Sequence, residues 1–215
     1  MSETTMDALP LFPLASVLFP GGWLALRIFE PRYLDLIARC QKSGEPFGVV
    51  QLIEGGEVRR RDAAAADGAF VRESFQPVGT LAQIEFCEKP QPGLLQIRCR
   101  GLQRFRLADS HCLPHGLWVG RAELLDHDAQ VPVPDDLRPL AGLLQGLLHT
   151  LEQGAAAAEL PLQPPYRWED SGWLANRWCE MLPLPAGERQ RLMQLDNPLL
   201  RLELVADQLD RLGIR

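Results

Sequence analysis

Prolines and glycines interrupt an uncharged apolar stretch, Ala8 to Leu26, near the start of this 215-residue chain. The interruptions are Pro10, Pro13, Pro20 and the pair Gly21-Gly22. Each proline removes a backbone N–H donor and the glycines admit positive φ, so one continuous helix cannot form here. The same breaks argue against a membrane-spanning helix, and short strands joined by turns are predicted instead.

The residues before this stretch and the cysteines both indicate a cytoplasmic protein. Glu3 and Asp7 stand where a secretory signal peptide carries Lys or Arg. The five cysteines are odd in number, widely spaced and without a CxxC pair, which is typical of a reducing compartment. We therefore expect a cytoplasmic location and no association with a membrane.

A strand and a helix are predicted directly after the glycine pair. From Trp23 to Phe29, apolar residues recur with a period of two, which predicts a strand with one buried face. A helix is predicted to begin at Pro31, beside the acidic Glu30, and to end at Gly44. Its apolar face would consist of Tyr33, Ile37 and Cys40.

Further strands with Pro and Gly between several of them complete the first half of the chain. They are expected at Phe47–Ile53, Val78–Phe86, Leu94–Arg100, Leu102–Leu107 and Leu117–Leu125. Residues 54–73 are polar, broken by glycine and rich in alanine, and we expect a mobile hairpin insertion there. Many short strands with one early helix predict a closed or nearly closed barrel.

The distribution of charge divides the chain near Asp126. Residues 1–125 contain 14 acidic and 14 basic residues, whereas residues 126–215 contain 14 acidic and 8 basic ones and carry the whole net charge of −6. The segment DHDAQVPVPDD at this point has the composition of a linker. We therefore predict two domains, residues 1–125 and residues 126–215.

The second half begins with a leucine-rich helix. Asp135 and Asp136 are predicted to cap it, Pro139 lies in its first turn, and Gly154 ends it. The repeating leucines are Leu137, Leu140, Leu144, Leu147 and Leu151. Two heptads are too few for a coiled-coil seam, so packing within a helical bundle is predicted.

Two more helices are predicted further along the chain. Asp170 and Ser171 cap the first of them, and Pro183 ends it. Its apolar stripe consists of Leu174, Trp178, Met181 and Leu182. The last helix begins at Asp196 and Pro198 and packs Leu202, Val205, Ala206 and Leu209 inward.

The opening segment from Leu9 to Tyr33, LPLFPLASVLFPGGWLALRIFEPRY, resembles the N-terminal domain of the Lon proteases. A proline-punctuated strand, an FPG turn, a second strand and an IFExRY helix entry stand there in this order. GTLAQIEF and GLLQIRCRGLQRFRL resemble successive strands of that domain, and DSGWLANRWCEMLPLP resembles its stand-alone bacterial form. The resemblance implies an α+β protein, with a PUA-like β pseudobarrel and one early helix followed by a C-terminal α-helical bundle.

The residues that perform catalysis in a full Lon protease have no counterpart in this sequence. That family carries a GxxxxGK(S/T) ATPase loop and a Ser-Lys peptidase dyad, whereas the only lysines here are Lys42 and Lys89, and neither has such surroundings. The four histidines lie in no recognisable nucleophile motif. We therefore predict no enzymatic activity and no cofactor.

A metal site is not expected either. The closest mixed set of metal-binding side chains is His111, Cys112 and His115, and no second cluster completes a four-ligand site. These three residues are interpreted as loop residues at the surface.

RNA binding is an alternative function, because the pseudobarrel fold implied by the resemblance also binds RNA. Arg98, Arg100, Arg104 and Arg106 occupy alternating positions of the predicted strands. The residues of opposite parity need a core, so the arginines are interpreted as the outward set of a half-buried hairpin. The first half is neutral overall, whereas phosphate binding is typical of a basic excess. Nucleic acid is therefore not the expected partner; a small-ligand-binding protein is the other alternative.

A polypeptide is the expected partner. By resemblance, the domain recognises exposed apolar segments of protein substrates, and a detached copy would bind unfolded or extended polypeptide or act as an adaptor for a protease or chaperone. Aromatic side chains combined with arginine are typical of peptide-binding hot spots. The predicted peptide-binding residues are Arg32, Arg167, Trp173, Asn176 and Arg177. Trp178 is expected in the core, and a local cation–π contact between Trp173 and Arg177 is the alternative interpretation of that pair.

Overall fold

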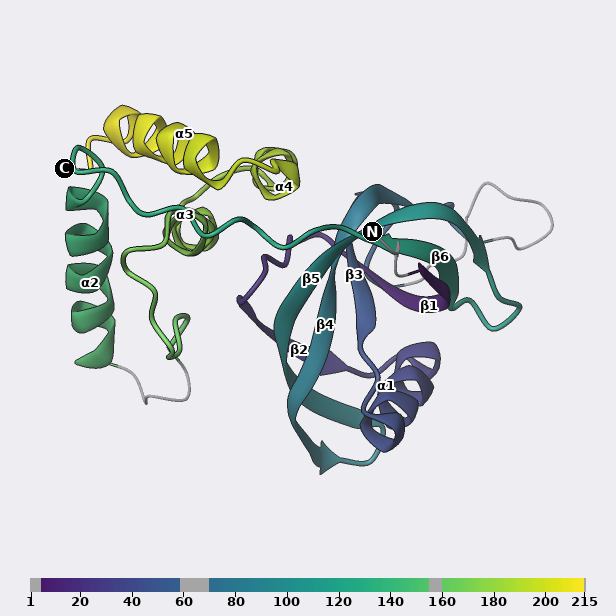
Figure 1. Cartoon of the computed structure of the whole chain (residues 1–215). Helices are drawn as coiled ribbons and strands as arrows, with labels where there is room; N and C mark the ends of the chain where they lie inside the picture. The colour runs from purple at the N-terminus through teal and green to yellow at the C-terminus, as the bar shows by residue number, and fades with distance from the viewer. Residues whose placement is uncertain (1–4, 59–69, 155–159, 215) are drawn as a thin grey trace. The chain divides into compact units, whose positions relative to one another are not determined.

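The computed structural model describes residues 5–58, 70–154 and 160–214. Strands make up the first part of the chain and helices the second, so the protein is α+β, as predicted (Figure 1). None of the described helices is long and apolar enough to cross a membrane.

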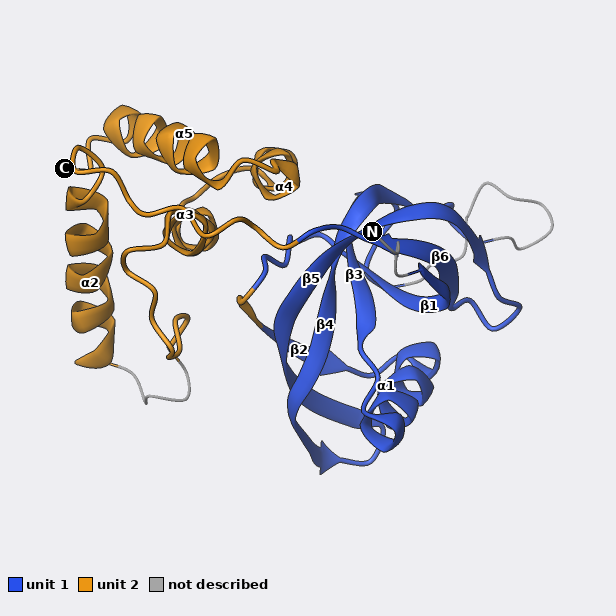
Figure 2. Ribbon diagram, in the orientation of Figure 1, with its two compact units in different colours: residues 1–20, 24–126 blue, residues 21–23, 127–215 orange. Residues whose placement is uncertain are grey.

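The chain divides into two compact units (Figure 2). Unit 1 consists of residues 1–20 and 24–126, and unit 2 consists of residues 21–23 and 127–215. The segment 21–23, which ends on the first residue of the second strand, belongs to unit 2, although the residues on both sides of it in sequence belong to unit 1. That each unit is a domain able to fold alone stays a prediction.

Unit 1 is a barrel-like sheet with one helix. Its elements are β1 (Thr5–Leu14), β2 (Trp23–Ile28), α1 (Pro31–Ser43), β3 (Phe47–Glu54), β4 (Ser74–Gln91), β5 (Leu94–Cys112) and β6 (Trp118–Leu124). The strand order is β2-β5-β4-β3-β1-β6, and an additional pairing of β5 with β6 brings the sheet back on itself. β1 and β3 are parallel, whereas β6 is antiparallel to both β1 and β5. The predicted pseudobarrel is therefore present.

β1 is one strand of 10 residues, and the prediction that prolines divide this segment into short strands is wrong here. Pro10 lies in the half of β1 that pairs with β6, and Pro13 lies in the half that pairs with β3. Each half has a strand on one side only, so a missing N–H need not remove a ladder hydrogen bond. The turn predicted after this strand follows it, with Gly21 at a φ of 73°.

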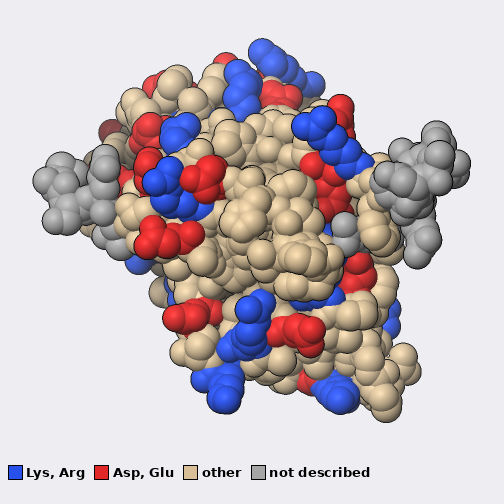
Figure 3. Space-filling view, turned by 90° about the vertical axis from the view of Figure 1, so that its right-hand side faces the viewer, with Lys and Arg blue, Asp and Glu red and all other residues tan. Residues whose placement is uncertain are grey.

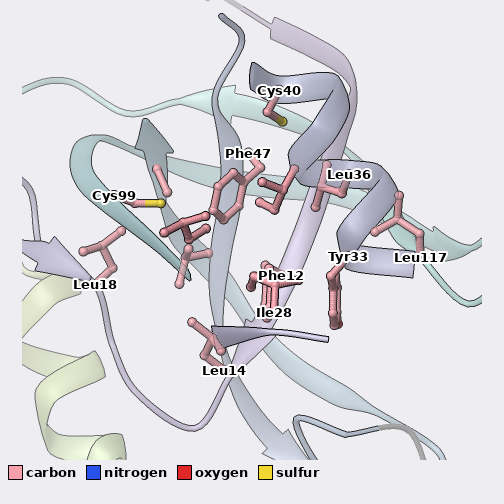
Figure 4. Close-up of a cluster of buried hydrophobic side chains, with 14 residues drawn as sticks. Phe12, Leu14, Leu18, Ile28, Tyr33, Leu36, Cys40, Phe47, Cys99 and Leu117 are labelled. Atoms are coloured by element: carbon pink, nitrogen blue, oxygen red, sulfur yellow. The ribbon is translucent and has the colours of Figure 1, made fainter. Parts of the chain in front are cut away.

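Two apolar clusters bury the two faces of β1. Leu9 and Leu11 belong to one cluster, and Phe12 and Leu14 belong to the other. This explains why the segment is apolar throughout instead of alternating. In Figure 4 the ring of Tyr33 lies beside that of Phe12, with centroids 3.9 Å apart and planes 11° apart. Helix α1 thereby covers one side of the sheet.

The helix predicted over residues 31–43 is confirmed. Pro31 occupies its first turn, and Gly44 ends it with a φ of 75° while its N–H donates to the carbonyl of Cys40. The predicted inward residues are all buried, and they are joined by Leu36 and Arg32. Burial of Arg32 is not part of the apolar pattern and has its own cause, described below.

β5 runs without a break through the two strands predicted at residues 94–100 and 102–107. Gly101 lies opposite Ala82, beside an irregularity in the pairing of β4 with β5. A Cβ at Gly101 would lie 2.2 Å from the carbonyl oxygen of Phe19, so only glycine fits there. The outward position predicted for Arg104 is wrong, because this side chain is buried, whereas Arg106 is exposed.

The insertion predicted over residues 54–73 lies mostly outside the described residues, which stop at residue 58 and resume at residue 70. Glu73, at its end, has a well-defined place in unit 1 because it binds Arg32 and Trp118.

Unit 2 contains four helices among its described residues. They are α2 (Pro139–Glu152), α3 (Ser171–Met181), α4 (Ala186–Gln194) and α5 (Pro198–Arg211). Capping of α2 by Asp135 and Asp136 is wrong: its N-cap is Arg138, which makes an exposed ion pair with Asp135 at 2.9 Å. The inward leucines of α2 are Leu140, Leu144 and Leu148, so the buried stripe lies one position away from the predicted Leu147.

The other caps of unit 2 follow ordinary capping chemistry. The Asp170 carboxylate accepts a hydrogen bond from the backbone N–H of Trp173 at 3.0 Å, as predicted. At α5 the cap is Asn197, which accepts from Leu199 and Leu200, while the predicted Asp196 lies one residue earlier. Helix α4 was not predicted, because its sequence AGERQRLMQ is mostly polar and has no clear apolar stripe.

Candidate functional site

Three aromatic rings meet at the start of α3 in unit 2. The centroids of Trp168 and Trp173 are 4.9 Å apart with planes at 83°, and those of Tyr166 and Trp168 are 5.1 Å apart. Tyr166 also meets Trp173, at 6.3 Å and 69°. All three side chains are half-buried, and Arg167 between them is exposed. We call Tyr166, Trp168 and Trp173 the aromatic cluster.

The polar tips of the aromatic cluster distinguish it from the core. Trp178, four residues after Leu174, is buried as predicted, and its indole N–H donates to the carbonyl of Leu140 at 3.1 Å. By contrast, the indole N–H groups of Trp168 and Trp173 donate to no group among the residues that the structure describes. Aromatic side chains that keep an unused donor and part of their surface are suited to bind a partner.

Backbone geometry fixes the position of the aromatic cluster. The N-cap bond of Asp170 orients the first turn of α3, from which Trp173 projects. Ser171 strengthens this entry, since its N–H donates to the carbonyl of Val131 and its hydroxyl to that of Pro132. Trp173 is thus attached to an ordered helix start, and Tyr166 and Trp168 lie on the segment directly before it.

Arg177 lies inward beside this cluster. Its guanidinium carbon is 6.0 Å from the centroid of the Trp173 ring, and its Nη2 donates to Glu180 at 3.1 Å. The side chain is only 3% exposed, which agrees with the local contact considered as an alternative for this pair. Burial raises the pKa of Glu180 to about 7, against the opposing charges of Arg177 and Arg189.

Asn176 also points inward, toward a buried arginine. Its Oδ1 accepts from Arg201 at 2.9 Å, and Arg201 is 1% exposed. The same guanidinium binds both carboxylate oxygens of Asp128 and the carbonyls of Leu192 and Leu195. This network ties α3, α5 and the segment after β6 together, so Asn176 has a structural partner inside unit 2.

Arg32 belongs to unit 1 and is the centre of a second buried network. Its guanidinium donates to Glu30 at 3.1 Å, to Glu73 at 3.1 Å and to the carbonyl of Gly116 at 2.8 Å. Glu73 in turn accepts from the indole N–H of Trp118 at 2.7 Å. Arg32 therefore pairs with acids and joins the start of α1 to the residue before β4 and to the β5–β6 turn. Its role as a peptide contact stays a prediction.

A groove of about 630 Å³ opens in unit 1 between β1 and α1. Residues 6–10 of β1 line one side of the groove, and Arg39, Glu45 and Pro46 are among the residues that line the other side. Figure 3 views the side of the molecule where β1, β6 and α1 lie in Figure 1: uncharged side chains occupy its centre and charged ones surround them. The sequence did not reveal this groove, because strand pairing and a helix end create it.

Tyr166 is the residue of the aromatic cluster that sequence reasoning missed. It lies seven residues before Trp173, outside α3, so helical spacing does not associate the two. The segment PPYRWED before the helix concentrates aromatic and charged residues, and this composition was the available signal.

The metal-binding and thiol side chains of the described residues complete the description of the site. They contain no group of three or more His, Cys, Asp and Glu side chains placed to hold a metal ion. His111, Cys112 and His115 are exposed near the β5–β6 turn. Burial raises the pKa of Cys99 and of Cys179 to about 12, which keeps both thiols protonated and unreactive at neutral pH.

Comparison of sequences identifies relatives of this architecture. The family model for the ATP-dependent protease La (LON) substrate-binding domain matches residues 8–211. The chain is also similar to a Lon protease of Paraburkholderia phytofirmans, with 28% identity over 223 residues that cover 96% of this chain and 25% of that protein. It thus spans about a quarter of the length of this relative.

Solved structures agree with the sequence comparison. The crystal structure of a Lon N-terminal domain protein from Xanthomonas campestris matches with a TM-score of 0.70 and 31% identity, over 94% of this chain and 98% of that one. The N-terminal domain of a Mycobacterium avium complex Lon protease shares the fold, with a TM-score of 0.55 and 18% identity over 94% and 97% of the two chains. This chain belongs to the family of the Lon protease substrate-binding domain.

Proposed function

We propose that this protein is a non-catalytic module that binds exposed apolar segments of unfolded or extended polypeptides, by itself or as an adaptor for a protease or chaperone. The family is that of a substrate-binding domain, which supports the polypeptide as ligand. The lack of an ATPase loop and of a Ser-Lys dyad supports a role without catalysis.

The aromatic cluster is the observation that carries the proposal. Its three rings are half-buried, lie 4.9–6.3 Å apart, and leave two indole donors unused among the described residues. Rings of this kind bury apolar side chains of a ligand while the indole N–H groups bind its backbone carbonyls. Arg167, exposed between the rings, would add a planar donor group for the same carbonyls.

The remaining predicted residues have supporting positions in this proposal. Arg177 lies against Trp173 and would hold that ring in place, and Asn176 would fix α3 through Arg201. Arg32 lies in unit 1 and would support the proposed function indirectly, by holding the fold of that unit together. Direct contact with the ligand is therefore assigned to Arg167 and Trp173, together with Tyr166 and Trp168.

The test measures binding of fluorescein-labelled, reduced and unfolded casein by anisotropy. Replacing both Trp168 and Trp173 by alanine should weaken binding at least about tenfold, since hot-spot aromatics commonly contribute 2 kcal/mol or more. The matched control is Phe86→Ala, which removes an aromatic side chain of unit 1 that is 52% exposed. Arg167→Glu, at an exposed position, provides a second variant that does not disturb packing. Unchanged binding by both variants would contradict the proposal.

A further inference from the structure

The first half of β1 has a neighbouring strand on one side only. It pairs with β6 from Thr5 to Leu11, but its pairing with β3 begins at Leu11, opposite Gly48. Backbone groups of a strand point alternately to its two sides, so those on the unpaired side of residues 6–10 have no ladder partner in a neighbouring strand. Such an edge is a template for one more strand.

The groove of unit 1 reaches this edge. It touches five consecutive residues of β1, from Met6 to Pro10. Side chains of a strand alternate between its faces, so a groove lying over one face would touch every second residue. Contact with all five shows that the groove reaches the backbone of β1, and its further contacts with Val119 and His111, on β6 and β5, show that it extends over one face of the sheet as well. On its other side, the pairing of β1 with β6 is irregular between Met6 and Leu9.

The residues just before β3 explain why this strand does not extend alongside residues 6–10 of β1. Continuing the parallel register backward from Leu11 and Gly48 would place Leu9 opposite Pro46. Proline has no N–H to donate, and the chain at Glu45 is still leaving the end of α1. The ladder therefore ends and the two chain segments separate, which leaves a groove of about 630 Å³, within the range of ligand sites.

The charges of the groove indicate what kind of segment it accepts. Asp7 and Glu45 line it together with Arg39; all three are exposed, and none makes an ion pair with another described residue. The two carboxylates outnumber the single guanidinium. The remaining lining is largely apolar, with Met6, Leu36, Leu113 and Val119 among it. A segment with apolar side chains and a basic residue complements this arrangement.

We propose that the groove between β1 and α1 binds an extended polypeptide segment by strand addition to residues 6–10, with preference for apolar segments flanked by Lys or Arg. Main-chain hydrogen bonds would supply the affinity, and Asp7 and Glu45 would supply the preference for basic residues. The inference rests on the proposed polypeptide-binding function and adds a second, independent site in the other unit.

The experiment uses the full chain and a fluorescein-labelled peptide of alternating valine and threonine with a lysine at each end. Two further peptides carry N-methyl groups on the odd or on the even residues. Strand addition uses the N–H groups of one edge only, so one methylated peptide should bind at least about tenfold more weakly and the other should bind like the parent. Equal binding of both methylated peptides, or no binding of the parent, would overturn the inference.

Variants of the chain locate the site. Ala8→Trp places a large side chain in the groove and should abolish binding, whereas Ala38→Trp, at an exposed position of α1 outside the groove, should leave it unchanged. The double reversal Asp7→Lys and Glu45→Lys should turn the preference from a peptide with lysine ends to one with glutamate ends. These are exposed positions, so this variant keeps the test decisive if Ala8→Trp does not fold.

The aromatic variant separates this inference from the proposed function. The protein with Trp168→Ala and Trp173→Ala should bind the lysine-ended peptide like the wild type, while its affinity for unfolded casein falls. If this variant loses the peptide and Ala8→Trp does not, the peptide binds at the aromatic cluster. That result would contradict the binding site proposed in the groove and would support the proposed function.

Discussion

Trp168 meets Trp173 edge to face, with ring centroids 4.9 Å apart and planes at 83°. Each ring limits the rotation of the other, and Arg177 lies within 6.0 Å of the second ring. Side chains that are ordered before binding lose less conformational entropy when a ligand arrives. The contact therefore pre-organises the start of α3 and the segment directly before it.

Tyr33→Ala should lower the free energy of unfolding by about 2–4 kcal/mol, near the range for losing a large buried side chain. The ring is 3% exposed and is stacked on Phe12 at 3.9 Å. Urea denaturation followed by far-UV circular dichroism measures the change. Tyr33→Phe keeps the ring and should stay within about 1 kcal/mol of the wild type. A Tyr33→Ala protein of unchanged stability would show that the stacking contributes nothing.

Arg32→Ala should destabilise the protein by about 3–5 kcal/mol, because it leaves the carboxylate of Glu73 buried without its cation. The side chains of Arg32 and Glu73 are 3% and 7% exposed. Arg121→Ala is the matched control: its ion pair with Asp109 is 53% and 58% exposed, so the loss should be within about 1 kcal/mol. Equal effects of the two changes, measured by urea denaturation, would contradict the structural role of Arg32.

Two glycines should respond to alanine in opposite directions. A Cβ at Gly79 would lie 2.3 Å from the carbonyl oxygen of Val49 and 2.7 Å from the ring of Phe105, so Gly79→Ala should cost about 3 kcal/mol. At Gly142, inside α2, nothing lies within 4 Å, and Gly142→Ala should stabilise by about 0.5–1 kcal/mol. Thermal unfolding measures whether each change raises or lowers the stability. A stabilising effect of Gly79→Ala would contradict the close packing of β3, β4 and β5.

Glu180 should make stability depend on pH. Its pKa is about 7 in the folded protein, raised by burial from an ordinary value of 4.5. The folded state thus binds more protons than the unfolded state between these values, so stability should fall as the pH rises from about 4.5 to about 7. Glu180→Gln should remove this part of the slope. Urea titrations of both proteins across this range test it, and parallel curves would show that Glu180 does not titrate as stated.

The fold was largely predictable because its local signals agree. Pro31 and Gly44 bound α1, Asp170 caps α3, and the apolar period of two identifies β2. Helix α4 lacked such a signal: its buried residues include Gln190 beside Leu192, a pattern set by its neighbours and not by an apolar stripe. The continuous β1 was missed because the tolerance for Pro10 depends on which strands lie beside it.

The candidate site was less predictable, because burial of polar side chains depends on partners distant in sequence. Asn176 and Arg177 follow Trp173 along one helix, and their composition alone suggested a binding surface. Arg201, 25 residues after Asn176, turns that residue inward. Arg32 is likewise buried by Glu73, 41 residues away. Tyr166 contacts Trp173 because the segment before α3 folds back toward the helix. No helical or strand periodicity of the sequence predicts such a contact.

Site-specific photo-crosslinking tests the central claim most directly. A benzophenone amino acid is introduced at position 167, between the rings of the aromatic cluster, and in a second protein at position 106, where exposed Arg106 lies on β5. Irradiation with labelled, unfolded casein should give a covalent adduct from position 167 and only background from position 106. Adducts from position 106 alone, or from neither position, would contradict polypeptide binding by the aromatic cluster.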